Sequence, residues 1–289
     1  MGNSDTVFII PPFQRNYSWD ETQCNELFDD ILDSVKKKRS HYIGNIVYFV
    51  GENNRAGFNE YILIDGQQRI TSILLLLCAI RSKLPKEEVK RLEKKFLINE
   101  DEKDDKYRVK LKQTENDYRI FEKIISNGEF SSDERDNKLF KNYNYFLDRI
   151  ADFDENTTIN IFNAIADLDI VDLNLQIEKD LEAVQKIFEK INSTGKELSE
   201  ADLIRNYLLI SNNSNTQNDL YNNYWVKIEE LYQNNDDISD FAKHYLITKR
   251  CIWVEEKKMY STFRLYFDNS DMTKEMILSE ILRYSQYYN

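Results

Sequence analysis

The chain has 289 residues, of which 41% are hydrophobic and 31% charged, and its formal net charge is −12 at pH 7. This composition is typical of a globular protein with a sizeable core, and it excludes a largely disordered chain. The negative charge argues against binding nucleic acid over a broad surface, although it leaves room for a local basic groove. No apolar run approaches the roughly 18 residues of a membrane span, and the first ten residues lack the order of a secretion signal. No membrane partner is therefore expected.

Cysteine and histidine are scarce. The three cysteines form no CxxC pair, and two of them, Cys24 and Cys78, fall on apolar helix faces. This pattern favours buried free thiols in a reducing cytoplasm. With His41 and His244 as the only histidines, a zinc site or a Cys/His catalytic pair has too few residues. The motifs of P-loop, Rossmann, zincin and serine-hydrolase sites are also missing.

The first third of the chain alternates predicted strands and helices. Runs rich in β-branched and aromatic residues predict strands, at residues 7–10, 42–50 and 60–64. A helix is predicted from about Trp19 to Lys38, opened by a capping box of Ser18 and Glu21. A second helix, at 66–84, is apolar almost all round and should be central in the core.

The remainder is predicted to be mainly helical, because glycine and proline are rare beyond residue 85. Several amphipathic helices are expected at about 85–165, with a short alternating stretch at 107–112. VDLNLQI (171–177) predicts a half-buried strand, which a helix follows until NSTG (192–195). Ser199 and Asp202 predict another capping box, and residues 215–289 are predicted to form helices rich in aromatic residues. The expected class is α+β, with a small mixed sheet and a mainly helical second half. The chain ends without a helix stop signal, which predicts that it is part of a longer protein.

The stretch DGQQR (65–69) lies where the third strand meets the central helix. Gly66 allows a tight turn and a close approach to the peptide N–H groups, which at a helix start attract anions. Arg69 can direct two donors at a phosphate, and Asp65 can orient a water or hold Mg²⁺. Gln67 and Gln68 offer amide contacts. The simpler alternative is that Asp65 caps the helix and the following residues form a solvated first turn.

Two other loops carry polar residues. Gln14 and Arg15 precede the first helix, next to Tyr17 and Trp19, which either stack on a base or pack in the core; packing is the better explanation for Trp19. Asn192, Ser193 and Thr194 end a later helix and either bind a ligand or simply terminate it. Ser199 and Asp202 are explained by capping. Arg205 either reaches a phosphate or forms a surface ion pair, and the ion pair is favoured.

Four blocks together resemble a known family. QRNYSW, HYIGNIVYF, LIDGQQRITSILLLL and IFEKINSTGKELSEADLIRNYLL, in that order over residues 8–210, resemble the N-terminal domain of the GmrSD family of type IV, modification-dependent restriction systems. The resemblance implies a ParB/sulfiredoxin-like core. It also implies a domain at 1–210 with a helical insertion at about 85–165, followed by a helical C-terminal region at 211–289.

The resemblance further implies a nucleoside-triphosphate site that uses Mg²⁺. Catalytic roles would fall on Asp65, Gln68 and Arg69, with Asp65 as the metal ligand. Nucleotide contacts would come from residues of the same motif and of the other two loops, namely Gln14, Arg15, Gly66, Gln67, Asn192 and Gly195. The implied partners are modified DNA, reached through the full-length protein, and a His-Me finger nuclease domain or subunit. The chain departs from the family there, because two histidines cannot supply that nuclease, so DNA cleavage by this chain alone is not expected.

Two interpretations remain. In the first, the chain is a nucleotide-hydrolysing regulatory domain of a DNA-restriction or phage-defence protein. In the second, it is a non-hydrolysing sensor or DNA-binding module that regulates a separate nuclease. The preferred base and the DNA modification are not encoded in any recognisable motif.

Overall fold

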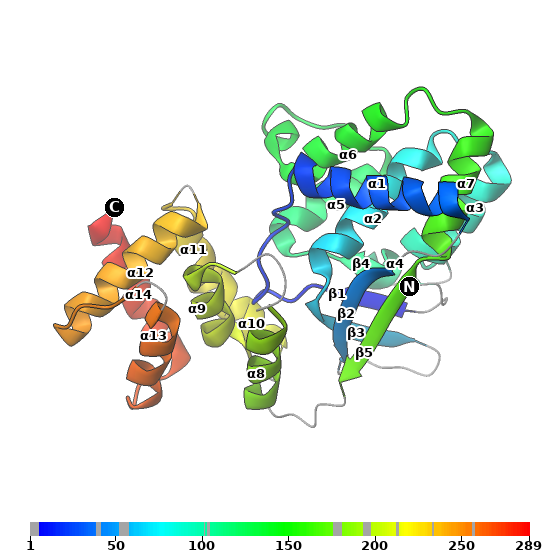
Figure 1. Ribbon diagram of the computed structural model, residues 1–289. Helices are drawn as coiled ribbons and strands as arrows, with labels where there is room; N and C mark the ends of the chain where they lie inside the picture. The colour runs from blue at the N-terminus through cyan, green and yellow to red at the C-terminus, as the bar shows by residue number, and fades with distance from the viewer. Residues whose placement is uncertain are drawn as a thin grey trace. The chain divides into compact units, whose positions relative to one another are not determined.

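The computed structural model describes residues 6–38, 42–51, 58–100, 102, 105–175, 181–192, 198–211, 214–232, 234–255 and 258–289. The chain divides into two compact units, residues 1–11 with 16–176 and residues 12–15 with 177–289. The first unit combines a sheet with helices and the second is helical, so the predicted α+β class is confirmed (Figure 1). Within the described residues, no helix is long and apolar enough to cross a bilayer.

The sheet of the first unit has five strands in the order β4-β1-β3-β2-β5. Strand β1 is parallel to β3 and to β4, β2 is antiparallel to β3, and β2 is parallel to β5. The strands are β1 (Thr6–Ile9), β2 (Tyr42–Val50), β3 (Asn59–Asp65), β4 (Leu111–Lys112) and β5 (Asp169–Leu175). All three strands predicted in the first third of the chain are present, and β2 has the predicted bounds.

Only the last two residues of the stretch at 107–112 form a strand, and residues Asp105–Arg108 form the short helix α4. Tyr107 packs its ring 5.1 Å from that of Phe58, beside Val7 of β1. Val109 forms an isolated antiparallel bridge with Ile98, so the alternating stretch is paired in places but is not one continuous strand.

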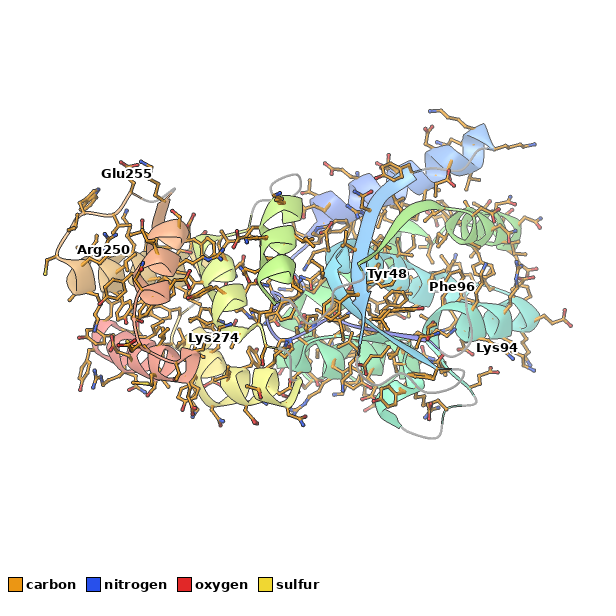
Figure 2. The ribbon with its side chains drawn as sticks, turned by 90° about the horizontal axis from the view of Figure 1, so that it is seen from below. Tyr48, Lys94, Phe96, Arg250, Glu255 and Lys274 are labelled. Carbon is orange, nitrogen blue, oxygen red and sulfur yellow. The ribbon has the colours of Figure 1, made fainter. Side chains whose placement is uncertain are left out.

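One face of the sheet packs against helices, which lie together on that side in Figure 1. They are α1 (Glu21–Lys37), α2 (Gln67–Arg81), α3 (Lys86–Leu92), the π-helix η1 (Glu93–Leu97), α5 (Glu115–Ser126), the 3₁₀ helix η2 (Asp133–Asp136), α6 (Lys138–Arg149) and α7 (Glu155–Ala166). Every residue of α2 except Arg69 is buried, which confirms the prediction of a central helix. On β2, Tyr48 (Figure 2) lies 5.5 Å from the ring of Phe8 and 4.6 Å from that of Tyr61.

The helices between residues 85 and 165 share the core of α2. Phe121, Phe146 and Phe162, from α5, α6 and α7, are fully buried in the same hydrophobic cluster as the α2 leucines. These helices are thus part of the unit that folds around α2, although the sequence interpretation treats them as an insertion.

The predicted cap of the first helix is wrong by two residues. The N-cap of α1 is Asp20, whose side chain accepts from Thr22, and Gln23 completes the capping box. Ser18 instead directs its backbone N–H toward Gln68 of α2, at 2.7 Å. The tertiary contact with α2 therefore decides where α1 begins.

The second unit contains α8 (Leu181–Asn192), α9 (Glu200–Leu209), α10 (Ser214–Leu220), the π-helix η3 (Tyr221–Trp225), α11 (Val226–Glu229), α12 (Asn235–Arg250), α13 (Met259–Asp268) and α14 (Lys274–Tyr288). The capping box of Ser199 and Asp202 at the start of α9 is confirmed. The predicted domain boundary at 210 differs from the division at 176/177, because α8 and α9 pack with the later helices of this unit.

Candidate functional site

The start of α2 has the features expected of an anion site. Strand β3 ends at Asp65, Gly66 is the N-cap with φ +90°, and the helix begins at Gln67. The N-cap position is held by Gly66, which has no side chain, so the alternative in which Asp65 is the N-cap is wrong. The first intrahelical bond joins the N–H of Ile70 to the carbonyl of Gly66 at 3.0 Å. The earlier N–H groups of a helix lack intrahelical acceptors and carry a partial positive charge.

Gly66 is required at this turn for two physical reasons. Its φ of +90° is a left-handed conformation that side chains with a Cβ rarely adopt. A Cβ there would also lie 3.1 Å from the carbonyl oxygen of Asn45 and 3.1 Å from Cγ1 of Ile46. Strand β2 therefore passes close to the start of α2, and the two sequence blocks HYIGNIVYF and DGQQR meet at this point.

Arg69 places a cation in the first turn of α2. Its Nη1 donates a hydrogen bond of 3.0 Å to the carbonyl oxygen of Asn45, and its side chain is half-buried. A guanidinium has five N–H donors in a planar fork, so this contact with Asn45 uses a small part of its capacity. The positive end of the helix and a positive side chain thus occupy the same turn.

Gln68 joins α2 to the loop before α1. Its Oε1 accepts from the backbone N–H of Ser18 at 2.7 Å and of Trp19 at 3.2 Å, and its Nε2 donates to the carbonyl of Asn16 at 3.2 Å. Gln67 and Gln68 are buried, so the alternative of a solvated first turn is also wrong. Gln68 holds the loop in place, and its predicted catalytic role stays a prediction.

A buried cluster of polar side chains holds Tyr17 of this loop in the core. The hydroxyl of Tyr17 lies 2.7 Å from Oγ of Ser72 and 3.4 Å from Sγ of Cys24, and it accepts from Nδ2 of Asn142 at 3.0 Å. Burial raises the pKa of the Tyr17 phenol well above its usual range. Tyr17 is buried and Trp19 packs against the same core, which confirms packing for Trp19 and assigns the same role to Tyr17.

The remaining predicted site residues belong to the second unit. Gln14, which is buried, and Arg15 belong to the second unit. Asn192 is the last residue of α8, and its side chain lies outside the part of the structure that is described, as does all of Gly195. Their participation in one site with Asp65 and Arg69 stays a prediction.

Arg205 forms an ion pair, as favoured, but the pair is buried and not on the surface. Its Nη1 lies 2.7 Å from Oε1 of Glu229, its Nε donates to the carbonyl of Pro12 at 3.0 Å, and 2% of its side chain is exposed. Its guanidinium also lies over the ring of Tyr221, 5.0 Å from the centroid. These contacts explain Arg205 by the packing of the second unit, and the phosphate alternative has no support.

No preformed metal cluster is found, because no three side chains of His, Cys, Asp or Glu in the described residues are grouped to hold an ion. Magnesium is commonly bound through one or two carboxylates together with substrate phosphates. The helix start at Gly66, Arg69 and the carboxylate of Asp65 fit such a ligand in chemical type. Donors suited to phosphate and one carboxylate suited to Mg²⁺ come from five consecutive residues.

Gly44 is a residue that the sequence interpretation missed. It lies in β2 with φ +99°, directly beneath the guanidinium of Arg69. An isolated glycine within a strand pattern is a known signal of a bulge or of a close backbone approach, and that signal could have identified it in YIGNIVYFV.

A mixed sheet whose third strand leads through a left-handed glycine into a buried helix defines an α+β domain built around a strand–helix turn. The chain belongs to a family described as GmrSD restriction endonuclease, N-terminal domain, whose model matches residues 1–209. The match includes all of the first unit together with α8 and α9. None of the curated proteins compared with the chain matches it. The family membership predicted from the four sequence blocks is thus confirmed, and the chain is a restriction protein by family.

Proposed function

We propose that the turn at Asp65–Arg69 binds a nucleoside triphosphate with Mg²⁺ and hydrolyses it, and that this reaction regulates restriction of modified DNA. The observation that carries the proposal is the start of α2, a helix N-terminus whose N-cap is a left-handed glycine, with Arg69 in its first turn. Helix starts of this kind attract phosphate through backbone N–H groups and the helix dipole.

Each residue of the turn has a role that follows from its chemistry. Gly66 lets phosphate oxygens approach the backbone, and Arg69 offsets their charge. Bound Mg²⁺ would supply further positive charge against the phosphates, held by Asp65. Gln14, Arg15, Gln67, Asn192 and Gly195 are the further proposed nucleotide contacts.

Hydrolysis also requires a group that orients the attacking water. Oε1 of Gln68 already accepts from two backbone N–H groups, whereas the carboxylate of Asp65 is half-buried at the end of β3. We therefore propose that Gln68 supports the turn and that Asp65, the one carboxylate of the motif, orients the water.

The partners proposed for this activity follow from the family. Modified DNA would be reached through the full-length protein, and a His-Me finger nuclease domain or subunit would cut it. Within the described residues, His244 stacks on the ring of Tyr288, with 5.6 Å between centroids, which is a packing role. Cleavage is therefore proposed to lie outside this chain.

The test is a panel of ATP, GTP, CTP and UTP with Mg²⁺ that scores thermal shift and phosphate release together. A nucleotide present at about 100 times its Kd stabilises the folded state by roughly 2.7 kcal/mol, which corresponds to a rise in Tm of roughly 5 °C or more. Arg69→Ala, with binding weakened roughly tenfold, should about halve the thermal shift, and Asp65→Ala should abolish phosphate release. Arg91→Ala is the matched control, because Arg91 is 52% exposed and lies on α3. Nucleotide binding and hydrolysis unchanged in both site variants would refute the proposal.

A second function is a sensor that binds nucleotide without hydrolysing it. The engagement of Gln68 with the loop favours it, because this leaves fewer groups in the turn to activate water. It predicts a saturable thermal shift with phosphate release no greater than in a protein-free blank. Release that depends on Asp65 would exclude it.

A further inference from the structure

Gly44 occupies an irregular point of strand β2. Its φ is +99°, and the pairing of β2 with β5 shifts register between Tyr42 and Asn45. Bulges of this kind redirect the chain and often lie beside functional sites. At this one the next carbonyl, that of Asn45, accepts the hydrogen bond from Nη1 of Arg69 at 3.0 Å.

The absence of a side chain at Gly44 makes room for the guanidinium. A Cβ built on Gly44 would lie 2.9 Å from Cζ of Arg69, 3.0 Å from Nη1 and 3.0 Å from Nη2. Three atoms at nearly equal distances mean that the guanidinium plane lies flat against Gly44. A methyl group there would push the arginine away, because the end of a long side chain yields more readily than a strand.

The same carbonyl of Asn45 also borders the start of α2, 3.1 Å from the place of a Cβ on Gly66. Two left-handed glycines, Gly44 and Gly66, thus allow one stretch of β2 to contact both the helix start and Arg69. The position of the cation relative to the first turn of α2 is determined by β2.

We propose that Gly44 is a positioning residue for the anion site, because it allows the β2 backbone to hold the Arg69 guanidinium in place before a ligand arrives. The identity of the ligand rests on the proposed function, but the contact itself does not. A side chain ordered in advance loses less conformational entropy on binding, so loss of Gly44 should weaken binding through Arg69.

The contact can be tested without nucleotide by a double-mutant cycle. Urea unfolding would be measured for the parent, Gly44→Ala, Arg69→Ala and the double variant. An alanine at position 44 strains the backbone at φ +99° equally in the parent and Arg69→Ala backgrounds. The clash between its Cβ and the guanidinium occurs only when Arg69 is present. Gly44→Ala should therefore lower the folding equilibrium constant by a larger factor when Arg69 is present. Equal factors in the two backgrounds would overturn the proposal.

Gly128→Ala is the control for glycine replacement. Its φ lies outside the left-handed region, and a Cβ there would make only ordinary contacts of 3.4 Å with Lys123. This variant should unfold at the parent's urea concentration and show no coupling to Arg69→Ala.

The effect on binding is measured with whichever of ATP, GTP, CTP or UTP binds the parent most tightly in the presence of Mg²⁺. Arg69→Ala should weaken binding roughly tenfold, as expected for the loss of a charge-assisted hydrogen bond, and Gly44→Ala by a similar factor. The double variant should bind no more weakly than Arg69→Ala. Unchanged affinity in Gly44→Ala beside weakened affinity in Arg69→Ala overturns the positioning role and leaves the proposed function standing. A parent that binds none of the four refutes the proposed function, and the unfolding cycle then decides the Gly44–Arg69 contact alone.

Discussion

Replacement of Gln68 by alanine separates its supporting role from a chemical one. The substitution removes one acceptor shared by the N–H groups of Ser18 and Trp19, and one donor to the carbonyl of Asn16. Gln68 itself is 8% exposed, so the polar groups left behind on its side of the loop are only partly rehydrated. We expect the free energy of unfolding to fall.

The magnitude follows from counting these bonds. Each hydrogen bond contributes about 1 kcal/mol net, and a buried group left without a partner costs about 1–3 kcal/mol. Three bonds, in a loop whose residues are half-buried, predict a loss of about 2–4 kcal/mol for Gln68→Ala. Gln68→Glu keeps both acceptor contacts but loses the donor to Asn16, so it should fall between Gln68→Ala and the parent.

Urea unfolding followed by circular dichroism measures this loss, with Gln23→Ala as the matched control. Gln23 also accepts a backbone hydrogen bond, from Asp20 at 3.0 Å, but at an exposed capping box. Its loss should cost about 0.5–1 kcal/mol. If Gln68→Ala were no less stable than Gln23→Ala and yet lost all phosphate release, the supporting role would be refuted and a chemical role favoured.

Three further predictions concern stability and reactivity away from the turn. Arg81→Ala should destabilise the first unit by about 3–5 kcal/mol, because buried Arg81 pairs with Glu93 and donates to the last carbonyls of α5. The control is Arg91→Ala, which removes an exposed ion pair of the same 3.2 Å length and should cost under about 1 kcal/mol. Equal losses of the two variants in urea unfolding would contradict this prediction. Burial lowers the pKa of Lys274 (Figure 2) to about 8 from 10.5, although Asp268 opposes the shift. The folded state therefore binds this proton less tightly than the unfolded chain. The free energy of unfolding of the parent, relative to that of Lys274→Met, should rise between pH 8 and 10. A difference between the two free energies that does not change with pH would refute this prediction. Ellman's reagent should modify one thiol in the native protein and three in denaturant, because Cys251 is exposed while the other two are buried; three equally fast reactions would contradict the burial.

Local sequence patterns predicted much of the first unit. Strand β2 has its predicted bounds, and β1, β3 and β5 lie within two residues of theirs, because apolar alternation and β-branched residues respond to a half-buried sheet. The capping box at Ser199 is likewise a contact between residues three apart in the chain. Contacts between residues this close in the chain can be predicted from the sequence.

Contacts between distant segments were predicted poorly. The N-cap of α1 is Asp20 and not the predicted Ser18, whose backbone N–H bonds to Gln68, fifty residues away. The apparent surface pair of Arg205 is a buried one because Pro12 and Glu229 converge on it within the second unit. Neither partner is near Arg205 in the sequence, so no local pattern could identify them.

The sequence by itself determined the family, the α+β class and the turn at Asp65–Arg69, since motif order and hydrophobic periodicity are properties of the chain alone. Only the tertiary structure decided that Asp65 is not the cap, that Gln68 supports a loop, and that Gly44 lies beneath Arg69. The physical reason is that strand pairing and close packing bring together backbone groups far apart in the chain. A polar residue can bind a ligand only with those donors and acceptors that are not already hydrogen-bonded within the fold.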